Sequence, residues 1–250
     1  MRIPERRKPV AAATINRELA RLKHMFALAL EAGKLMTKPR IKLLKEDNVR
    51  TGFFEPQQFA DVLRHLSDDV RPVVQFAYIT GWRVKSEVVA LEWRQVDFKA
   101  GEIGLEPGTT KNKDGRTFPF TKEPRALLEA QHAEHQRLAK RGVVVPWVFF
   151  RMVAKGRGGE RFPKPITSIT KGFKAACRKA GHPGFIPHDL RRSAVRNLVR
   201  AGVPQTVAMK LTGHRTDSVF RRYDIVSPDD LRVAVERLDK VTTIGAVIEG

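Results

Sequence analysis

Four side chains in the last third of the sequence have types and spacing suited to chemistry on a phosphodiester. They are His188, Arg191, His214 and Tyr223. A tyrosine phenol ionises near pH ~10, so a nucleophilic tyrosine needs a neighbour that takes its proton and cations that stabilise the developing charge. Histidine can exchange a proton near neutral pH, and the arginine guanidinium forms a rigid fork that matches phosphate oxygens. Together these four residues predict a site at which tyrosine attacks a phosphate.

Two short helices are predicted to position these side chains. Apolar residues at 190, 194, 198 and 201 have helical spacing, and Gly202 ends this helix. His188 and Arg191 are three positions apart on it, so both lie over the same turn. A second helix over 204–211 ends at a glycine and presents His214 just beyond its end.

These residues also carry a resemblance. The pattern His188-x-x-Arg191, followed by Leu211-Thr212-Gly213-His214 and then by Tyr223, resembles the second conserved box of the tyrosine recombinase (phage integrase) family. Members of that family also require an arginine in a Thr-Gly-x-Arg turn and a lysine on a β-hairpin, both upstream.

An upstream turn matches the first box of the family. Thr80-Gly81-Trp82-Arg83 supplies the arginine, and the resemblance implies that Arg83 clamps the scissile phosphate. The family commonly has two residues between this arginine and the next glutamate, whereas three residues separate Arg83 from Glu87 here. We therefore expect the turn to bulge by one residue, which leaves the role of Glu87 more open than that of Arg83.

Strand signals follow this turn. Residues 102–105 read as a strand, and Asp114-Gly115 is typical of a two-residue hairpin turn, here between 109–113 and 116–120. Lys111 and Lys113 would share a face, because side chains alternate along a strand. The resemblance places the catalytic lysine of the family on such a hairpin, at Lys111, with Lys113 as the alternative.

The resemblance implies a fold and an activity. The fold is mainly α with a small antiparallel β-sheet (α+β), the tyrosine recombinase catalytic-domain fold. The activity is that of a site-specific DNA recombinase, or integrase, which cuts and rejoins DNA through a covalent 3′-phosphotyrosyl intermediate. Two alternatives are a nicking-closing enzyme similar to type IB topoisomerases and a truncated DNA-binding remnant. The implied catalytic residues are Arg83, Lys111, His188, Arg191, His214 and Tyr223.

Neither a cofactor nor a metal is required by this chemistry, because the cationic side chains take the role of a divalent ion. The implied partners are double-stranded DNA recombination sites, three further copies of the chain in a homo-tetramer on DNA, and accessory DNA-bending proteins. The DNA sequence recognised, and the direction of the reaction between integration and excision, stay open at this point, because base contacts cannot be placed from sequence.

Composition supports a polyanionic partner. The 250 residues include 47 Lys and Arg against 27 Asp and Glu, which gives a net charge of +20 and a pI near 10.6. Nucleic acid is favoured over a membrane, because no apolar run approaches the ~18 residues of a spanning helix. On charge alone, general RNA binding is the alternative. The single cysteine, Cys177, excludes an internal disulfide and a cysteine-based zinc cluster, and we expect a cytoplasmic, nucleoid-associated protein.

Three regions are predicted along the chain. Residues 1–52 are a partial N-terminal helical DNA-binding (core-binding) region and linker, with a helix that Thr14 caps and Gly33 closes. Residues 53–240 form the catalytic domain by resemblance. Residues 241–250 are a C-terminal tail, which either contacts a neighbouring protomer, as in the family, or is loose.

Several residues are predicted to lie outside the chemistry. Tyr78 and Cys177 are expected to pack in the core, and His132 and His135 are expected at the surface of a helix over 123–139. The arginines at 192, 196 and 200 form an i, i+4 stripe that either meets backbone phosphates or is solvated.

Overall fold

The computed structural model describes residues 10–46, 50, 52–108, 114–156, 158–223, 226 and 228–241. The chain divides into two compact units, Met1–Arg50 and Thr51–Gly250. In this described part of the chain, no helix is long and apolar enough to cross a membrane. The assignment of a DNA-binding role to residues 1–52 stays a prediction.

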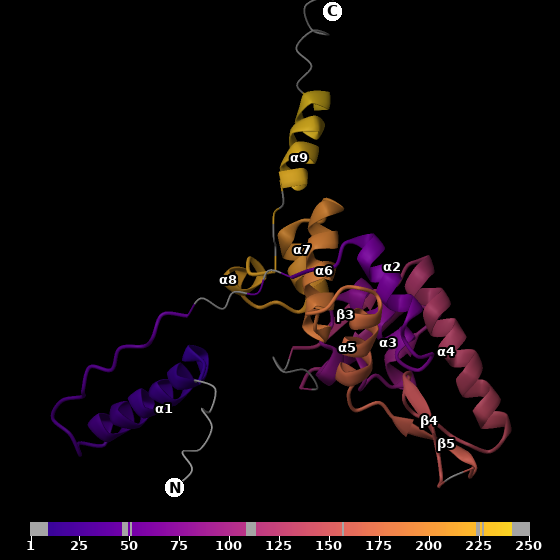
Figure 1. Cartoon of the computed structure of the whole chain (residues 1–250), viewed down its shortest axis with the longest axis horizontal. Coiled ribbons are helices and arrows are strands. Elements are labelled where there is room, and N and C mark those ends of the chain that lie inside the picture. Colours follow the sequence, from indigo (N-terminus) through magenta and orange to yellow (C-terminus); the bar gives the residue numbers. More distant parts are fainter. Residues whose placement is uncertain are drawn as a thin grey trace, which may run out of the picture. The chain divides into compact units, whose positions relative to one another are not determined.

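The first unit contains helix α1 (Ala12–Glu31), shown in indigo in Figure 1. The helix begins before Thr14, and Ala11 in an extended conformation occupies the N-cap position without a side-chain hydrogen bond. Asn16 is buried and ties the irregular segment after the helix back onto it. Its amide donates to the Leu44 carbonyl (2.9 Å) and accepts from the Leu44 N–H (2.7 Å).

The second unit is mainly helical with two small antiparallel sheets, which confirms the predicted α+β class. Its α-helices are α2 (Pro56–Arg64), α3 (Arg71–Thr80), α4 (Lys122–Lys140), α5 (Thr170–Lys179), α6 (Pro187–Arg200), α7 (Gln205–Thr212), α8 (Asp217–Phe220) and α9 (Pro228–Val241). Two further turns are η1 (Val84–Val88) and η2 (Trp93–Gln95). The strands are β1 (Val96–Asp97), β2 (Glu102–Leu105) and β3 (Arg116–Pro119) in one sheet, and β4 (Phe150–Ala154) and β5 (Arg161–Pro165) in the other.

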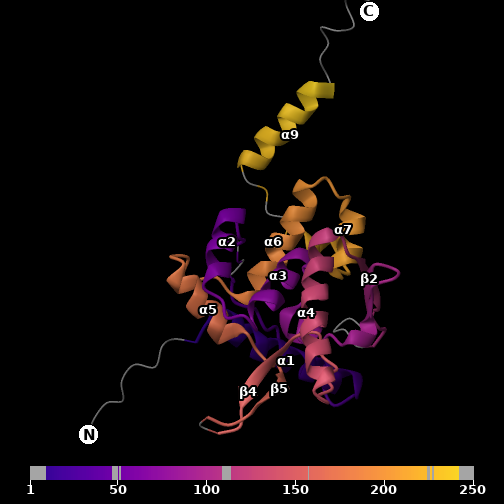
Figure 2. The ribbon, with the colours of Figure 1, turned by 90° about the vertical axis from the view of Figure 1, so that its right-hand side faces the viewer.

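The core of this unit forms where α3 packs along α6, in the middle of the ribbon in both Figure 1 and Figure 2. The sequence of α3 is almost wholly apolar, and Val73, Phe76 and Ala77 are fully buried there. Tyr78 stacks on Phe59 with ring centroids 3.7 Å apart, in line with its predicted packing role. Cys177 is also buried, and burial raises the pKa of its thiol to about 11. Both groups therefore contribute to packing rather than to chemistry.

Strand β3 pairs with β2, in the register Ile103↔Phe118 and Leu105↔Arg116. The Ile103–Phe118 pair is buried, which stabilises this pairing. The hairpin between 109–113 and 116–120 stays a prediction. Residues 109–113, which include Lys111 and Lys113, lie outside the described residues.

Two expectations need correction. His132 and His135 are not simply at the surface: they are half-buried against Trp93, with ring centroids 4.9 and 5.5 Å away. Their helix covers the indole, and this apolar contact outweighs the polar character of the sequence around them.

The arginine stripe of α6 is neither solvated nor free to meet phosphates. Arg196 donates to Glu55 (2.8 Å) and Asp230 (3.1 Å), and Arg200 donates to the same two carboxylates (3.1 and 2.6 Å). Arg196 is 2% exposed and covers the ring of Phe53 at 3.5 Å. We call Glu55, Arg196, Arg200 and Asp230 the Glu55 cluster. It joins α6 to the start of α2 and to α9, so Arg196 and Arg200 are structural.

Candidate active site

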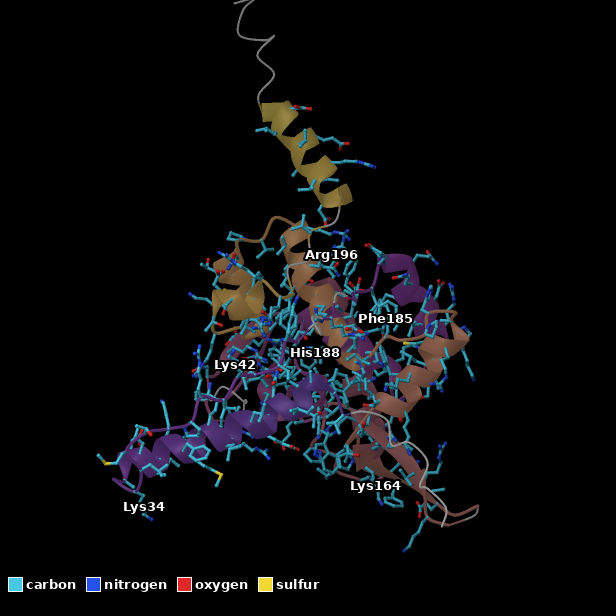
Figure 3. The ribbon with its side chains drawn as sticks, turned by 60° about the vertical axis from the view of Figure 1, so that its left-hand side comes forward. Lys34, Lys42, Lys164, Phe185, His188 and Arg196 are labelled. Carbon is cyan, nitrogen blue, oxygen red and sulfur yellow. The ribbon has the colours of Figure 1, made fainter. Side chains whose placement is uncertain are left out.

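The phenol of Tyr223 lies against the start of α6. Its hydroxyl is 2.8 Å from Nε2 of His188, the second residue of that helix. The Asp189 carboxylate fixes this helix end by accepting a hydrogen bond from the Ile186 N–H (2.9 Å). Figure 3 shows His188 near this end of α6 and Arg196 further along the same helix. The contact joins residues 35 positions apart in the sequence.

His188 is suited to accept a proton. One edge of its ring is open to solvent, while partial burial and then the charges of Arg191 and Arg192 lower the pKa of the imidazole below its usual 6.5. The ring is therefore neutral at pH 7. A neutral Nε2 can accept the hydrogen bond that the Tyr223 hydroxyl donates.

Arg191 connects the two sequence boxes. Its Nη1 donates to the carbonyls of Gly81 and Thr212, both at 2.6 Å, and its Nη2 lies 3.1 Å from Nε2 of His214. The side chain is 2% exposed. Burial, followed by repulsion from Arg83, lowers the pKa of its guanidinium to about 10. The guanidinium is still charged at pH 7 and is held by backbone atoms from both boxes.

His214 is placed by the left-handed glycine that ends α7. Gly213 has φ of 72°, which glycine adopts without strain, and the chain turns there toward Arg191. The Thr212 hydroxyl donates to the Ala208 carbonyl (2.7 Å), so its oxygen accepts from Nδ1–H of His214 (2.7 Å). Burial, then the charges of Arg191 and Arg83, lower the pKa of His214 to about 3. The ring is thus a neutral, oriented polar group.

The extra residue after Arg83 is absorbed by a π-helical turn. In η1 the N–H of Val88 bonds to the Arg83 carbonyl (3.1 Å) and that of Val89 bonds to the Val84 carbonyl (3.1 Å), both five residues back. This wider turn keeps Glu87 directed at Arg83. The Glu87 carboxylate accepts from the Arg83 backbone N–H and from Nη1, both at 2.7 Å. The role of Glu87, left open by the sequence, is to hold Arg83.

Arg116 is a charged residue of this site that sequence reasoning missed. It lies on β3, donates to the second oxygen of Glu87, and stacks over Trp82 with its Cζ 4.9 Å from the ring. Its side chain is 8% exposed, and burial lowers the pKa of its guanidinium. The available signal was strand alternation: Arg116 and the apolar Phe118 are two residues apart and so share the inward face of β3.

We call Arg83, Glu87, Arg116 and Arg191 the Glu87 cluster. Among the described residues, Glu87 pairs with two of the three guanidiniums, those of Arg83 and Arg116, and the cluster has two positive charges in excess. A cleft of about 620 Å³ opens beside it, lined by Arg83, His188 and Arg191. A second cavity of about 480 Å³ is lined by Arg116, Gly213 and His214. The excess charge faces space in which an anion can bind.

Five of the six residues predicted for the site come together here. The ring of Tyr223 lies 4.7 Å from that of His214 and 5.8 Å from Cζ of Arg191. Arg83 joins them through Arg191 and Glu87, while Lys111 falls outside the described residues. Within the part of the chain that is described, no group of three or more His, Cys, Asp or Glu side chains could hold a metal ion.

Two proteins of known sequence are similar to this chain over most of its length. The integrase of Salmonella phage P22 is 27% identical over 239 residues, which cover 94% of this chain and 59% of that protein. The tyrosine recombinase XerC of Lactobacillus delbrueckii subsp. bulgaricus is 28% identical over 235 residues, covering 90% of this chain and 76% of that protein. The chain therefore spans about three fifths of the P22 integrase and about three quarters of XerC.

The fold has matches among solved structures. The Tn1549 transposon integrase, in a complex with a circular intermediate DNA, superimposes with a TM-score of 0.67 at 19% identity over 92% of this chain and 80% of that one. This likeness confirms the predicted catalytic-domain fold. The sequence model of the phage integrase family matches residues 53–229, well over half of the chain. The chain therefore belongs to the phage integrase family of tyrosine recombinases.

Proposed function

We propose that this protein is a site-specific DNA recombinase that cuts and rejoins DNA through a covalent 3′-phosphotyrosyl intermediate. The observation that carries the proposal is the hydrogen bond between the Tyr223 hydroxyl and His188, set beside the guanidinium of Arg191. A nucleophile, a proton acceptor and a fixed cation thus meet at the edge of one cleft.

The first step is attack by Tyr223 on a phosphodiester. The hydroxyl proton passes to the neutral Nε2 of His188 over 2.8 Å as the bond from the phenol oxygen to phosphorus forms. The bond from phosphorus to the 5′ oxygen breaks, so the DNA keeps a 3′-phosphotyrosyl link and releases a 5′ hydroxyl. We assign Lys111, which the family resemblance puts forward, as the acid that protonates the leaving oxygen.

The excess charge of the Glu87 cluster suits this step. Negative charge on the non-bridging oxygens grows in the transition state, and Arg83 and Arg191 are held in advance by Glu87 and by two backbone carbonyls. A phosphate that arrives at His214 favours its charged form, so this ring gains a proton to donate as the anion binds.

Rejoining reverses the same chemistry. A 5′ hydroxyl of another strand attacks the phosphotyrosine and gives its proton to Lys111, the phenol oxygen leaves, and His188 returns the proton to that oxygen. One phosphodiester is exchanged for another through one phosphotyrosine, so the energy of the broken bond is conserved and no nucleotide is consumed. The similarity of the chain to an integrase and to a tyrosine recombinase supports this mechanism.

Covalent capture tests the proposal. A library of nicked duplexes with randomised sequence around the nick is incubated with the protein, because the short fragment beyond the nick diffuses away and traps the adduct. DNA that stays with the protein on a denaturing gel is sequenced. We expect adducts that enrich one sequence, and Tyr223→Phe should form none while it still binds the selected duplex.

Other outcomes identify the alternatives. Adducts without sequence enrichment, together with relaxation of supercoiled plasmid, would favour a nicking-closing enzyme similar to type IB topoisomerases. Binding without any adduct would favour a DNA-binding remnant and would exclude a recombinase.

We further propose that four copies act together on two duplexes. Strand exchange between two double helices requires four cuts, and each copy carries one Tyr223. The net charge of +20 favours assembly on DNA rather than in free solution, because like charges repel without the phosphates. Light scattering with and without the selected duplex should show the tetramer only with DNA. Association with the nucleoid, and accessory bending proteins, are expectations that follow from such a substrate.

A further inference from the structure

We propose that Arg116 is a positioning residue of the site: through Glu87 it orients Arg83, and by packing against Gly213 it fixes the loop that carries His214. This inference rests on the proposed function, because the group that Arg83 and His214 would hold is the phosphate of DNA. Arg116 itself does not touch the phenol of Tyr223 or line the cleft beside His188.

The contact with Glu87 carries the first part of the proposal. One oxygen of this fully buried carboxylate accepts from Nη1 of Arg83, and the other accepts from the Arg83 backbone N–H and from Nη2 of Arg116. Without Arg116 the carboxylate would keep only the two bonds from Arg83 itself, one to each oxygen. Arg116 adds a bond from a different element, β3, and fixes the carboxylate relative to the rest of the fold, so the direction of the Arg83 side chain depends on Arg116.

The contact with Gly213 carries the second part. A Cβ added at position 213 would overlap the guanidinium of Arg116, so the chain passes directly over this side chain just before His214. Beneath it lies Trp82, whose indole N–H donates to the Leu211 carbonyl (3.0 Å). Arg116 is therefore packed between the turn that carries Arg83 and the loop that carries His214.

The burial of Arg116 is unfavourable without such a role. Its Nε is buried and has no hydrogen-bond partner among the described residues, and burial lowers the pKa of the guanidinium. An ion pair in a protein interior gives little net stability, because the desolvation penalty offsets the attraction. Orientation of Glu87 and His214 accounts for a charged side chain at this place, where an apolar one would pack at lower cost.

The test is the variant Arg116→Met, which keeps the length of the side chain and removes its charge and donors. Single-turnover capture of the nicked duplex selected by the wild-type protein gives both a rate constant and an amount of adduct. We expect the rate constant to fall by about 10- to 100-fold, which is the usual loss when a residue that orients a catalytic group is removed. A merely structural role would lower the amount of adduct and leave the rate constant unchanged, which would overturn the proposal.

A double variant tests the route through Glu87. If Arg116 acts on Arg83 by way of this carboxylate, adding Arg116→Met to Glu87→Gln should cost less than about threefold in the rate constant. Full additivity of the two effects would overturn this route. The matched control is Arg94→Met. Arg94 is an exposed arginine that pairs with the carboxylates of Glu92 and Glu106, and its loss should leave the rate constant unchanged.

A measurement without DNA separates this inference from the proposed function. The order parameter of the Arg83 Nε–H bond, from 15N relaxation, should fall in Arg116→Met and not in Arg94→Met, because Glu87 no longer holds Arg83 in one direction. An unchanged order parameter would overturn the positioning role. If the wild-type protein forms no adduct with any duplex, the proposed function fails, and this measurement still decides whether Arg116 orders Arg83.

Discussion

Helix α6 carries arginines into two clusters whose charges are balanced differently. In the Glu55 cluster two guanidiniums face two carboxylates. Burial lowers the pKa of Arg200, but the bonds to Glu55 and Asp230 and their charges outweigh burial, so the pKa is raised. In the Glu87 cluster one carboxylate lies among three guanidiniums and pairs with two of them, those of Arg83 and Arg116. Burial and then repulsion from Arg83 lower the pKa of Arg191 to about 10. We infer that a shortage of carboxylates, together with burial, marks the arginines that we propose to hold the DNA phosphate.

The sharpest way to break this comparison is to remove one arginine from the cluster with excess charge. Arg83→Gln should lower the single-turnover rate of adduct formation by ~10²–10³-fold, by analogy with the loss of one donor to a transition-state oxyanion. The loss of stability should be small, because Arg83 is about a quarter exposed and its glutamate keeps Arg116. Equal rates for the variant and the wild type would remove Arg83 from the chemistry.

Removing an arginine from the Glu55 cluster should lower the stability of the fold and leave the rate of adduct formation unchanged. Arg196→Met leaves Glu55 and Asp230 with one guanidinium between them, and we expect a loss of about 2 kcal/mol in the free energy of unfolding, reduced by the partial exposure of both acids. Urea unfolding measures this loss. Adduct formation by the folded fraction should stay near the wild-type rate. A large fall in rate at full stability would contradict the division into a structural and a substrate-facing cluster.

The pH dependence of adduct formation sharpens the comparison further. His188 accepts a proton only when neutral, and burial with the charges of Arg191 and Arg192 lowers its pKa below 6.5. The rate constant should therefore stay level as pH falls through 6.5 and then drop by about tenfold per pH unit below the lowered pKa. Arg83 also contributes to this lowering, so the drop should move to higher pH in Arg83→Gln. Arg196→Met is the control, and its profile should match that of the wild type.

The smallest predicted effect needs no DNA. Inorganic phosphate at three times its dissociation constant should stabilise the wild-type protein by about 0.8 kcal/mol, because it binds the folded state at the excess charge. Arg196→Met should keep this increment and Arg83→Gln should lose it. Thermal unfolding with phosphate, matched to chloride at equal ionic strength, measures both. Stabilisation that survives Arg83→Gln would place the anion elsewhere.

Most residues of the site could be predicted from the sequence because they lie at helix ends or in a helix with a recognisable pattern. Gly81 and Gly213 end helices, and the motifs around them, with Arg83 and His214 just beyond, carry the resemblance to the family. The helical periodicity of α6 likewise placed His188 and Arg191 on one turn. These features depend on neighbours within a few residues, which a single sequence contains.

The failures involve partners far apart in the chain. Arg116 and Glu87 are 29 residues apart. The stripe of α6 was expected to be either solvated or in contact with phosphates, because Glu55 lies about 140 residues upstream of Arg196. No local periodicity carries such information, since burial of a charge is decided by what the folded chain brings to it.

The π-helical turn η1 has a consequence for comparing this chain with its relatives. Two backbone hydrogen bonds that each span five residues accommodate the extra residue. Glu87 still contacts Arg83. An alignment should therefore open a one-position gap inside residues 84–86, rather than shift the register downstream. Glu87 then aligns with the glutamate of homologues that have the shorter turn, and insertion of a single residue there is the event to look for in the lineage.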